Sequence, residues 1–165
     1  MGETIKNLIA ICLLQKGPQD LPYSPAALVF FIAAGSAVSH IAAANIPGTE
    51  NLTLKVLIAA LFGLFFIYAT LAVRNYTQRF MQTATAVFGA DAVIAIPVAM
   101  VTLGLDGRSP EQAPTAALVV LLLWLWHISI LGHILRHALD IRLPLGILIA
   151  IIYSFLSFQV VQLAT

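Results

Sequence analysis

Apolar residues occur in five long runs that are separated by short polar stretches. A helix that crosses a bilayer needs about 20 mostly apolar residues, and all five runs meet that requirement. The fourth connection, at 140–144, is the tightest, so we expect the last two spans to be antiparallel neighbours. The sequence therefore predicts an all-α, polytopic membrane protein with five transmembrane helices. The predicted spans are residues 25–46, 52–73, 84–105, 115–139 and 143–164.

The first 20 residues have a different pattern. Apolar side chains recur there at the i, i+3, i+4, i+7 spacing of one helix face, but the stretch is too short to span a membrane. We predict an amphipathic interfacial helix over residues 1–20, followed by a transmembrane domain over residues 21–165. A docking helix for a partner subunit is the alternative. The apolar stripe consists of Ile5, Leu8, Ile9 and Cys12.

Composition agrees with a membrane protein. Hydrophobic residues make up 61% of the chain and charged residues 9%, against roughly 45–50% and 25% in soluble domains. So few charges exclude an ordinary soluble enzyme, a disordered chain and a nucleic-acid binder. The single cysteine, Cys12, excludes an internal disulfide and a Cys/His zinc site. We expect no metal and no nucleic acid as partner.

The distribution of Lys and Arg predicts the orientation, because cytoplasmic loops carry an excess of these residues. A cytoplasmic N-terminus places six of them inside and two outside. Five spans then place the C-terminus on the opposite, periplasmic side of a bacterial inner membrane. The inside set is Lys6, Lys16, Arg74, Arg79, Arg136 and Arg142, and the outside set is Lys55 and Arg108.

Asp91 is the one carboxylate inside a predicted span. It lies about 10 Å from the cytoplasmic edge, and His133 in the fourth span lies about 9 Å from that edge, at a rise of 1.5 Å per residue. We predict that the two form a polar pair, because a partner reduces the cost of burying a carboxylate. A structural clamp, a proton relay or ion-coupling site, a contact with a partner protein, and a protonated Asp91 remain alternatives.

His40 and His127 lie at comparable predicted depth on different spans. Two histidines that face each other at one level can be the axial ligands of a b-type haem. Hydrogen-bonded histidines between helices are the simpler interpretation, so no cofactor is expected and haem b is kept as an alternative.

Charged and histidine side chains gather where the fourth span ends. Arg136, His137 and Arg142 are predicted to lie at the level of the cytoplasmic lipid headgroups. A basic patch that binds anionic headgroups or a cytoplasmic partner is the alternative to a merely interfacial position. His133 and His137 are four residues apart, so we expect them to share a helix face.

Small residues indicate where helices approach closely, since in lipid such residues let backbones pack together. The first span is small on nearly every side, so it is predicted to be the central helix. Bulky faces on the second and fourth spans are predicted to face lipid or a partner. The small-residue positions are Ala33, Gly35, Ala37, Ser39, Ala59 and Gly63.

Three short strings resemble the small Yip1-type, five-span inner-membrane proteins of proteobacteria. They are Leu21-Pro-Tyr-Ser-Pro-Ala-Ala-Leu28, Arg79-Phe-Met-Gln-Thr-Ala-Thr-Ala-Val-Phe-Gly89 and Gly132-His-Ile-Leu-Arg-His-Ala-Leu139. The resemblance implies a membrane-embedded adaptor or scaffold, and it brings no catalytic residues with it.

The functional prediction is a non-enzymatic accessory or scaffold subunit, in lipid, that binds other integral membrane proteins or further copies of itself. No phosphate-binding loop, Ser/His/Asp set or pair of intramembrane carboxylates indicates catalysis. A small oligomeric transporter or channel that uses Asp91 is the second hypothesis, and a haem-bearing electron-transfer subunit with His40 and His127 is the third. The feature that distinguishes the transporter is an Asp91 that faces a wet cavity.

Overall fold

The computed structural model describes residues 2–44, 51–104 and 113–163 of the chain, and these residues form helices joined by turns. Five of the helices are long and apolar enough to cross a membrane, which confirms the prediction of a multi-pass membrane protein. The predicted span ends at 45–46, 105 and 164 lie outside the described residues. The five helices are α2 (Pro25–Ala44), α3 (Leu52–Val73), α4 (Phe80–Leu103), α5 (Pro114–Leu139) and α6 (Leu143–Leu163).

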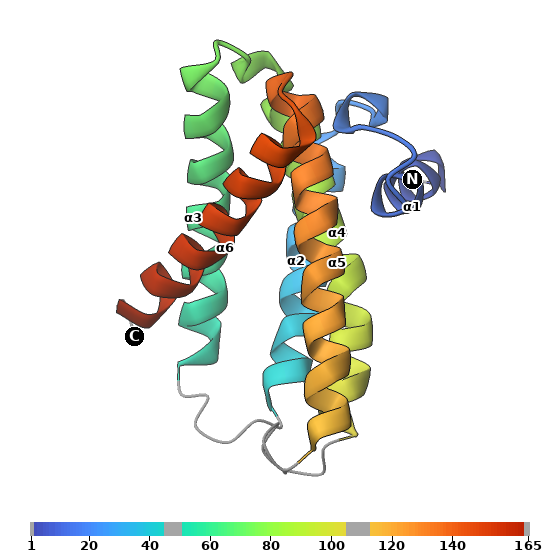
Figure 1. The fold of residues 1–165 in the computed structure, drawn as a ribbon, viewed down its shortest axis with the longest axis vertical. Coiled ribbons are helices and arrows are strands. Elements are labelled where there is room, and N and C mark those ends of the chain that lie inside the picture. Colours follow the sequence, from blue (N-terminus) through green and yellow to red (C-terminus); the bar gives the residue numbers. More distant parts are fainter. Residues whose placement is uncertain (1, 45–50, 105–112, 164–165) are drawn as a thin grey trace.

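The helices α2, α4 and α5 stand side by side, while α3 stands apart from them (Figure 1). The helix α6 runs obliquely from the α5–α6 turn towards α3. We call the end where α4 begins and α5 ends the basic end, and the opposite end, where α4 ends and α5 begins, the far end. The basic end carries Arg74, Arg79, Arg136 and Arg142.

The central helix is α4, so the prediction that the first span is central was wrong. Every residue from 83 to 90 in α4 is buried, because α1, α2, α3 and α5 all contact this helix. Its buried threonines satisfy their hydroxyls within the helix, as Thr83 donates to the Arg79 carbonyl and Thr85 to the Met81 carbonyl. Small side chains therefore occur on both α2 and α4, but only those of α4 are enclosed by other helices on all sides.

The helix α4 begins at Phe80, one turn before the predicted start at residue 84, and directly after the short 3-10 helix η2 (Thr77–Arg79). The Arg79 guanidinium donates from one nitrogen to the carbonyls of His137, at 3.3 Å, and Ala138, at 3.1 Å. A cation at this position satisfies carbonyls that the end of α5 leaves unpaired. The contact fixes the start of α4 against the end of α5.

The turn between α5 and α6 confirms that these helices are antiparallel neighbours. Asp140 ends α5 with a φ of 54°, a left-handed conformation that Asp tolerates better than most residues. Two glycines then let the helices approach closely. A Cβ at Gly132 would lie 2.7 Å from Ile147 Cγ1, and one at Gly146 would meet the Gly132 carbonyl oxygen and lie 3.1 Å from Arg136 Cβ.

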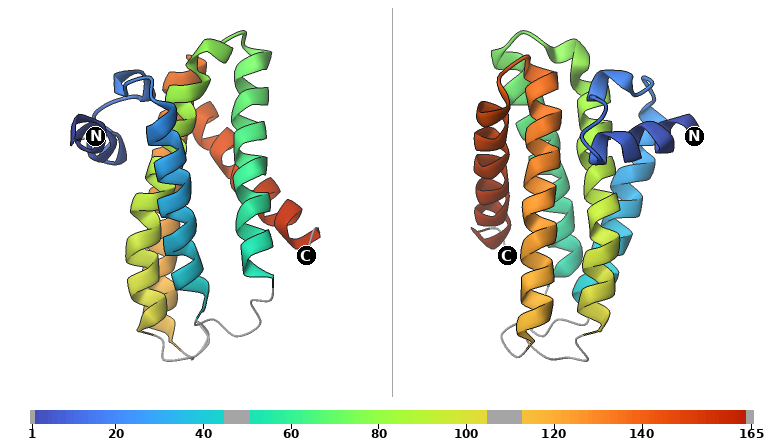
Figure 2. Two further views of the ribbon diagram at one scale, coloured as in Figure 1. Left: turned by 180° about the vertical axis from the view of Figure 1, so that it is seen from behind. Right: turned by 45° about the vertical axis from the view of Figure 1, so that its right-hand side comes forward.

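The N-terminal helix α1 (Gly2–Cys12) packs across α4 and α5, and Figure 2 shows it beside the bundle near the basic end. Its buried side chains are Thr4, Leu8, Ile11 and Cys12, whereas Ile5 and Ile9 are exposed. The predicted apolar stripe is therefore divided between a face against the bundle and an outward face. A Cβ at Gly89 of α4 would lie 2.6 Å from Leu8, so this glycine makes room for Leu8.

Three side chains of the bundle bind the backbone of the N-terminal segment. Trp126 Nε1 donates to the Cys12 carbonyl at 3.2 Å, and Gln82 Nε2 donates to the Leu21 carbonyl at 2.7 Å. His133 Nε2 lies 2.9 Å from the Lys16 carbonyl oxygen. The segment up to η1 (Pro18–Asp20) and Leu21 is thus fastened to α4 and α5.

Substitution of Gly146 by Ala should destabilise the protein, because its nearest neighbours are backbone and Cβ atoms that cannot rotate away. We expect a cost of about 1–3 kcal/mol, typical of overpacking, and a lower melting temperature in detergent. Gly35→Ala is the matched control: its Cβ would lie 3.5 Å from Ala92, an ordinary contact. Equal melting temperatures for the two variants would contradict the close α5–α6 approach.

The docking of α1 can be followed through Cys12, the only cysteine in the chain. Burial, with the nearby Asp91 charge adding to it, raises the pKa of the Cys12 thiol to about 11. The reactive thiolate is therefore scarce at pH 8, and maleimide labelling should be about 100-fold slower than for a free thiol. Trp126→Phe removes the bond to the Cys12 carbonyl and should speed labelling, whereas Trp124→Phe should not. Rapid labelling of the unmodified protein would show that α1 is not docked.

Candidate functional site

A carboxylate–imidazole pair lies between α4 and α5. His127 Nε2 is 2.7 Å from Asp91 Oδ1, and the side chains remain 20% and 31% exposed respectively. The predicted pair of Asp91 with His133 was therefore wrong. Because α4 begins at Phe80, Asp91 lies eleven residues, about 16 Å, from the basic end of its helix. His127 lies twelve residues, about 18 Å, from the end of α5, so it is the histidine at the level of Asp91.

His133 has a different partner. It is 7% exposed, and its ring nitrogen contacts the Lys16 carbonyl. Its ring lies 4.7 Å, centroid to centroid, from that of His137 in an edge-to-face arrangement, which confirms that the two share a helix face. His133 thus holds the N-terminal segment rather than the intramembrane carboxylate.

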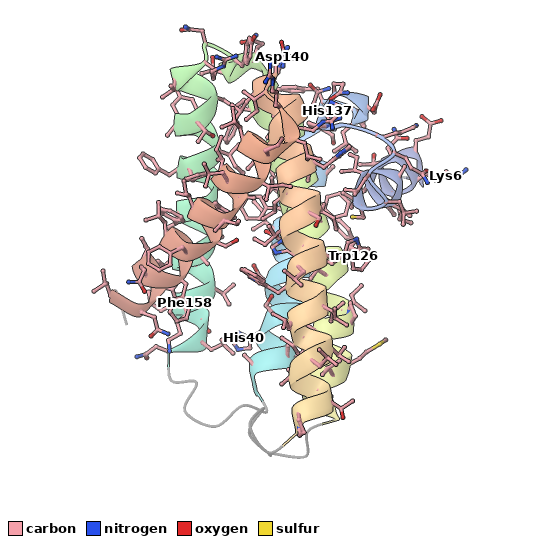
Figure 3. All side chains as sticks on the ribbon, viewed as in Figure 1. Lys6, His40, Trp126, His137, Asp140 and Phe158 are labelled. Atoms are coloured by element: carbon pink, nitrogen blue, oxygen red, sulfur yellow. The ribbon has the colours of Figure 1, made fainter. Side chains whose placement is uncertain are left out.

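His40 is exposed near the far end of α2, where it is labelled in Figure 3. It does not line the cavity that contains His127. The structure brings His127 to Asp91 and not to His40, so the two histidines are not arranged as facing ligands. Within the described ranges, no three His, Cys, Asp or Glu side chains gather as a metal site.

The Asp91–His127 pair lies in the wall of a cavity of about 690 Å³, to which all five long helices contribute. Near the middle of the bundle the cavity is bounded by Phe31, Phe88 and Tyr153. It continues to Lys55 in the first turn of α3 and Thr102 in the last turn of α4, both at the far end. At its other end the lining includes Phe88 of α4, and the preceding residues 83–87 of that helix are buried.

Four serine hydroxyls line this cavity, in two pairs with i, i+3 spacing. Ser36 and Ser39 come from α2, and Ser154 and Ser157 from α6. Serines in apolar helices usually bond a carbonyl one turn earlier, as Ser129 does with the Leu125 carbonyl. None of the four makes such a bond to any described residue. Their hydroxyls are available to a molecule in the cavity.

None of these serines was predicted to line a binding site, although their spacing carries a signal. Serine pairs at i, i+3 within two apolar spans place hydroxyls on one face of each helix. The two serine faces line the same cavity because α6 runs obliquely. No local sequence pattern predicts this course of α6.

The predicted packing residues have mixed roles. Gly35 lies against Ala92 of α4, and Gly63 against Phe88 and Tyr153. Ser39 and Ala59 line the cavity instead of a helix contact. Ala33 and Ala37 are exposed, so this predicted pair mediates no packing in the described structure.

The predicted basic-end group of Arg136, His137 and Arg142 is only partly a surface patch. Arg142 is exposed, and Arg136 and His137 are half-buried. His137 lines a second, smaller cavity of about 320 Å³ together with Arg79 and Asp140. Because Arg79 is bound to the end of α5 and Asp140 is acidic, this cavity is not a simple anion site.

The large cavity is thus mostly apolar, with a few polar groups that converge on it. Such lining is typical of small-molecule sites, whose volumes are about 300–1,000 Å³. The Asp91–His127 pair can bind or release a proton there, and Asp91 Oδ2, which no described residue binds, can accept a further donor.

Comparison with protein-family models, with curated proteins and with solved structures finds no match to this chain. The chemistry of the cavity is therefore what indicates the function.

The pairing of Asp91 with His127 predicts an ordered set of stabilities. His127→Leu leaves the carboxylate without its partner and should cost about 1–3 kcal/mol, while Asp91→Asn removes the charge, keeps an acceptor and should be mild. The double variant should be more stable than His127→Leu alone. Melting temperatures in detergent test this order, and His40→Leu, which changes an exposed histidine on α2, should leave the melting temperature unchanged. A double variant that is the least stable of the three would contradict the pairing.

Proposed function

We propose that the chain is a small transporter that takes up a small molecule in the large cavity and exchanges it against a proton held by Asp91 and His127. The observation that carries the proposal is the position of this pair in the wall of a cavity of about 690 Å³ inside the membrane-spanning helices. Ionisable groups at membrane depth are costly and typically belong to ion or substrate pathways.

The same observation ranks transport above the scaffold function. A purely structural Asp91 would be sealed between helices, yet 31% of its side chain stays exposed next to the cavity. The scaffold function, the membrane-protein partners, the homo-oligomer and the Yip1-type resemblance stay predictions. The absence of an enzymatic activity also stays a prediction.

The orientation proposed from the sequence assigns the two ends of the bundle to the two sides of the membrane. Six of the eight Lys and Arg residues belong to the basic end or the N-terminal segment, which the positive-inside rule assigns to the cytoplasm. The far end, to which the cavity extends, then lies on the periplasmic side of a bacterial inner membrane. In the same orientation α1 lies at the cytoplasmic interface, where exposed Ile5 and Ile9 can enter the lipid.

Transport also requires a state that opens to the other side. The helix α6 packs extensively on α5, whereas α3 contacts α2 and α4 much less extensively than α2 contacts α4. We therefore propose that α3 moves relative to the other four long helices. Movement of one part of a bundle against another is the usual form of alternating access.

A proton-flux assay tests the proposal. Proteoliposomes that contain a pH-sensitive dye would be given separate panels of amino acids, simple amines, carboxylates and sugars. We expect at least one class to drive proton movement, and Asp91→Asn and His127→Gln to reduce its rate at least 10-fold while both variants still fold. Glu3→Gln, which changes an exposed carboxylate on α1, should leave the rate unchanged. Flux that is insensitive to Asp91→Asn, or no flux with any class, would contradict a proton-linked transporter.

A further inference from the structure

We infer that the cavity binds a zwitterion, with its ammonium group at Asp91 and its acidic group at Lys55. The inference rests on the proposed function, because it names the substrate class of the same cavity. It rests on two opposite charges, Asp91 and Lys55, that line one cavity at different levels along the bundle.

The part of the cavity around Asp91 suits an ammonium group. Asp91 Oδ1 is bound by His127, whereas Asp91 Oδ2 has no partner among the described residues. Trp124, Phe88 and Tyr153 belong to the same lining. A carboxylate oxygen beside aromatic rings is a typical environment for an organic ammonium group.

The far end of the cavity carries a cation that is unpaired among the described residues. Lys55 is half-buried in the first turn of α3 and lines the cavity. Its ammonium group has no ion pair or hydrogen bond with any residue that the structure describes. A lysine at this position attracts an acidic group of a ligand.

The two charges lie at different levels along the bundle. Gly63 of α3 faces Phe88 of α4. Lys55 is eight residues from Gly63 towards the far end, about 12 Å, and Asp91 is three residues from Phe88 in the same direction, about 4.5 Å. Lys55 is therefore roughly 7 Å closer to the far end. Side chains lean towards the N-terminus of their helix, so Lys55 and Asp91 lean apart.

The wall between the two charges suits a short extended chain. It is mostly apolar, with the four unbonded hydroxyls of Ser36, Ser39, Ser154 and Ser157 along it. An aliphatic chain can lie on this wall, and the hydroxyls can bind polar groups at either end of the ligand.

The charge balance favours a zwitterion over a simple ion. Among the described residues, the titratable groups that line the cavity are Lys55 from α3, Asp91 from α4, His127 from α5 and Tyr153 from α6, and α2 contributes none. With a neutral imidazole, this described part of the lining holds one positive and one negative charge. A cation or an anion leaves one of them unmatched in an apolar site, whereas a zwitterion pairs with both.

Three matched probes test the inference by calorimetry on the purified full-length protein. They are ε-aminocaproate, which carries both charges, hexylamine, which lacks the acid, and hexanoate, which lacks the amine. We expect ε-aminocaproate to bind at least 10-fold more tightly than either single-charge probe. Lys55→Gln should weaken ε-aminocaproate about 10-fold and leave hexylamine unchanged, and Asp91→Asn should weaken both ε-aminocaproate and hexylamine.

Controls separate lost binding from lost folding. Lys55→Arg keeps the charge and should keep the preference for ε-aminocaproate, and Lys6→Gln changes an exposed lysine on α1 and should have no effect. Three results would overturn the inference that the cavity binds a zwitterion. They are tighter binding of hexylamine or hexanoate, equal binding of all three probes, and no binding of ε-aminocaproate. In each of those cases proton flux with another substrate class would still support a transporter, so the two proposals fail separately.

Discussion

The hydrogen bond between Asp91 and His127 constrains how α4 and α5 pack against each other. A carboxylate about 16 Å into a spanning helix is costly unless a partner binds it, and here His127 does so while 31% of the Asp91 side chain stays exposed. The bond requires the two residues to lie at one level. That level is set at the basic end, where Arg79 joins the start of α4 to the last carbonyls of α5. A contact at the membrane edge thus decides which histidine faces the carboxylate.

The surroundings of the pair differ on its two sides. On one side, α1 packs on α4 and α5, with Leu8 against Gly89 and the Cys12 carbonyl bound by Trp126, the neighbour of His127. On the other, α6 leaves α5 obliquely after the close approach at Gly146 and crosses α3 (Figure 1). The cavity on this side is lined by all five long helices. The N-terminal segment therefore supports the two helices that carry the pair, while α3 and α6 border the space in front of it.

The sequence predicted what depends on local pattern. Five spans, the antiparallel α5–α6 turn and the shared face of His133 and His137 follow from apolar run length and from helical spacing. The predicted partner of Asp91 was wrong because residues 80–83 were taken as lying before the helix, and an error of one turn moves a residue by about 5 Å. The serine-lined cavity and the central position of α4 depend on the oblique course of α6 and on long-range contacts, which spacing along the chain does not encode.

The central claim is that Asp91 and His127 face a cavity that opens at the far end. Labelling with a membrane-impermeant maleimide in intact cells tests it directly, in a Cys12→Ser background so that each variant has one thiol. Ser39→Cys and Ser157→Cys lie in the cavity lining, whereas Ala37→Cys lies on the exposed outer face of α2. The account predicts that the two cavity cysteines react from the far side and that the Ala37 position, in lipid, does not. Unreactive cavity cysteines, or equal reaction at all three positions, would contradict it.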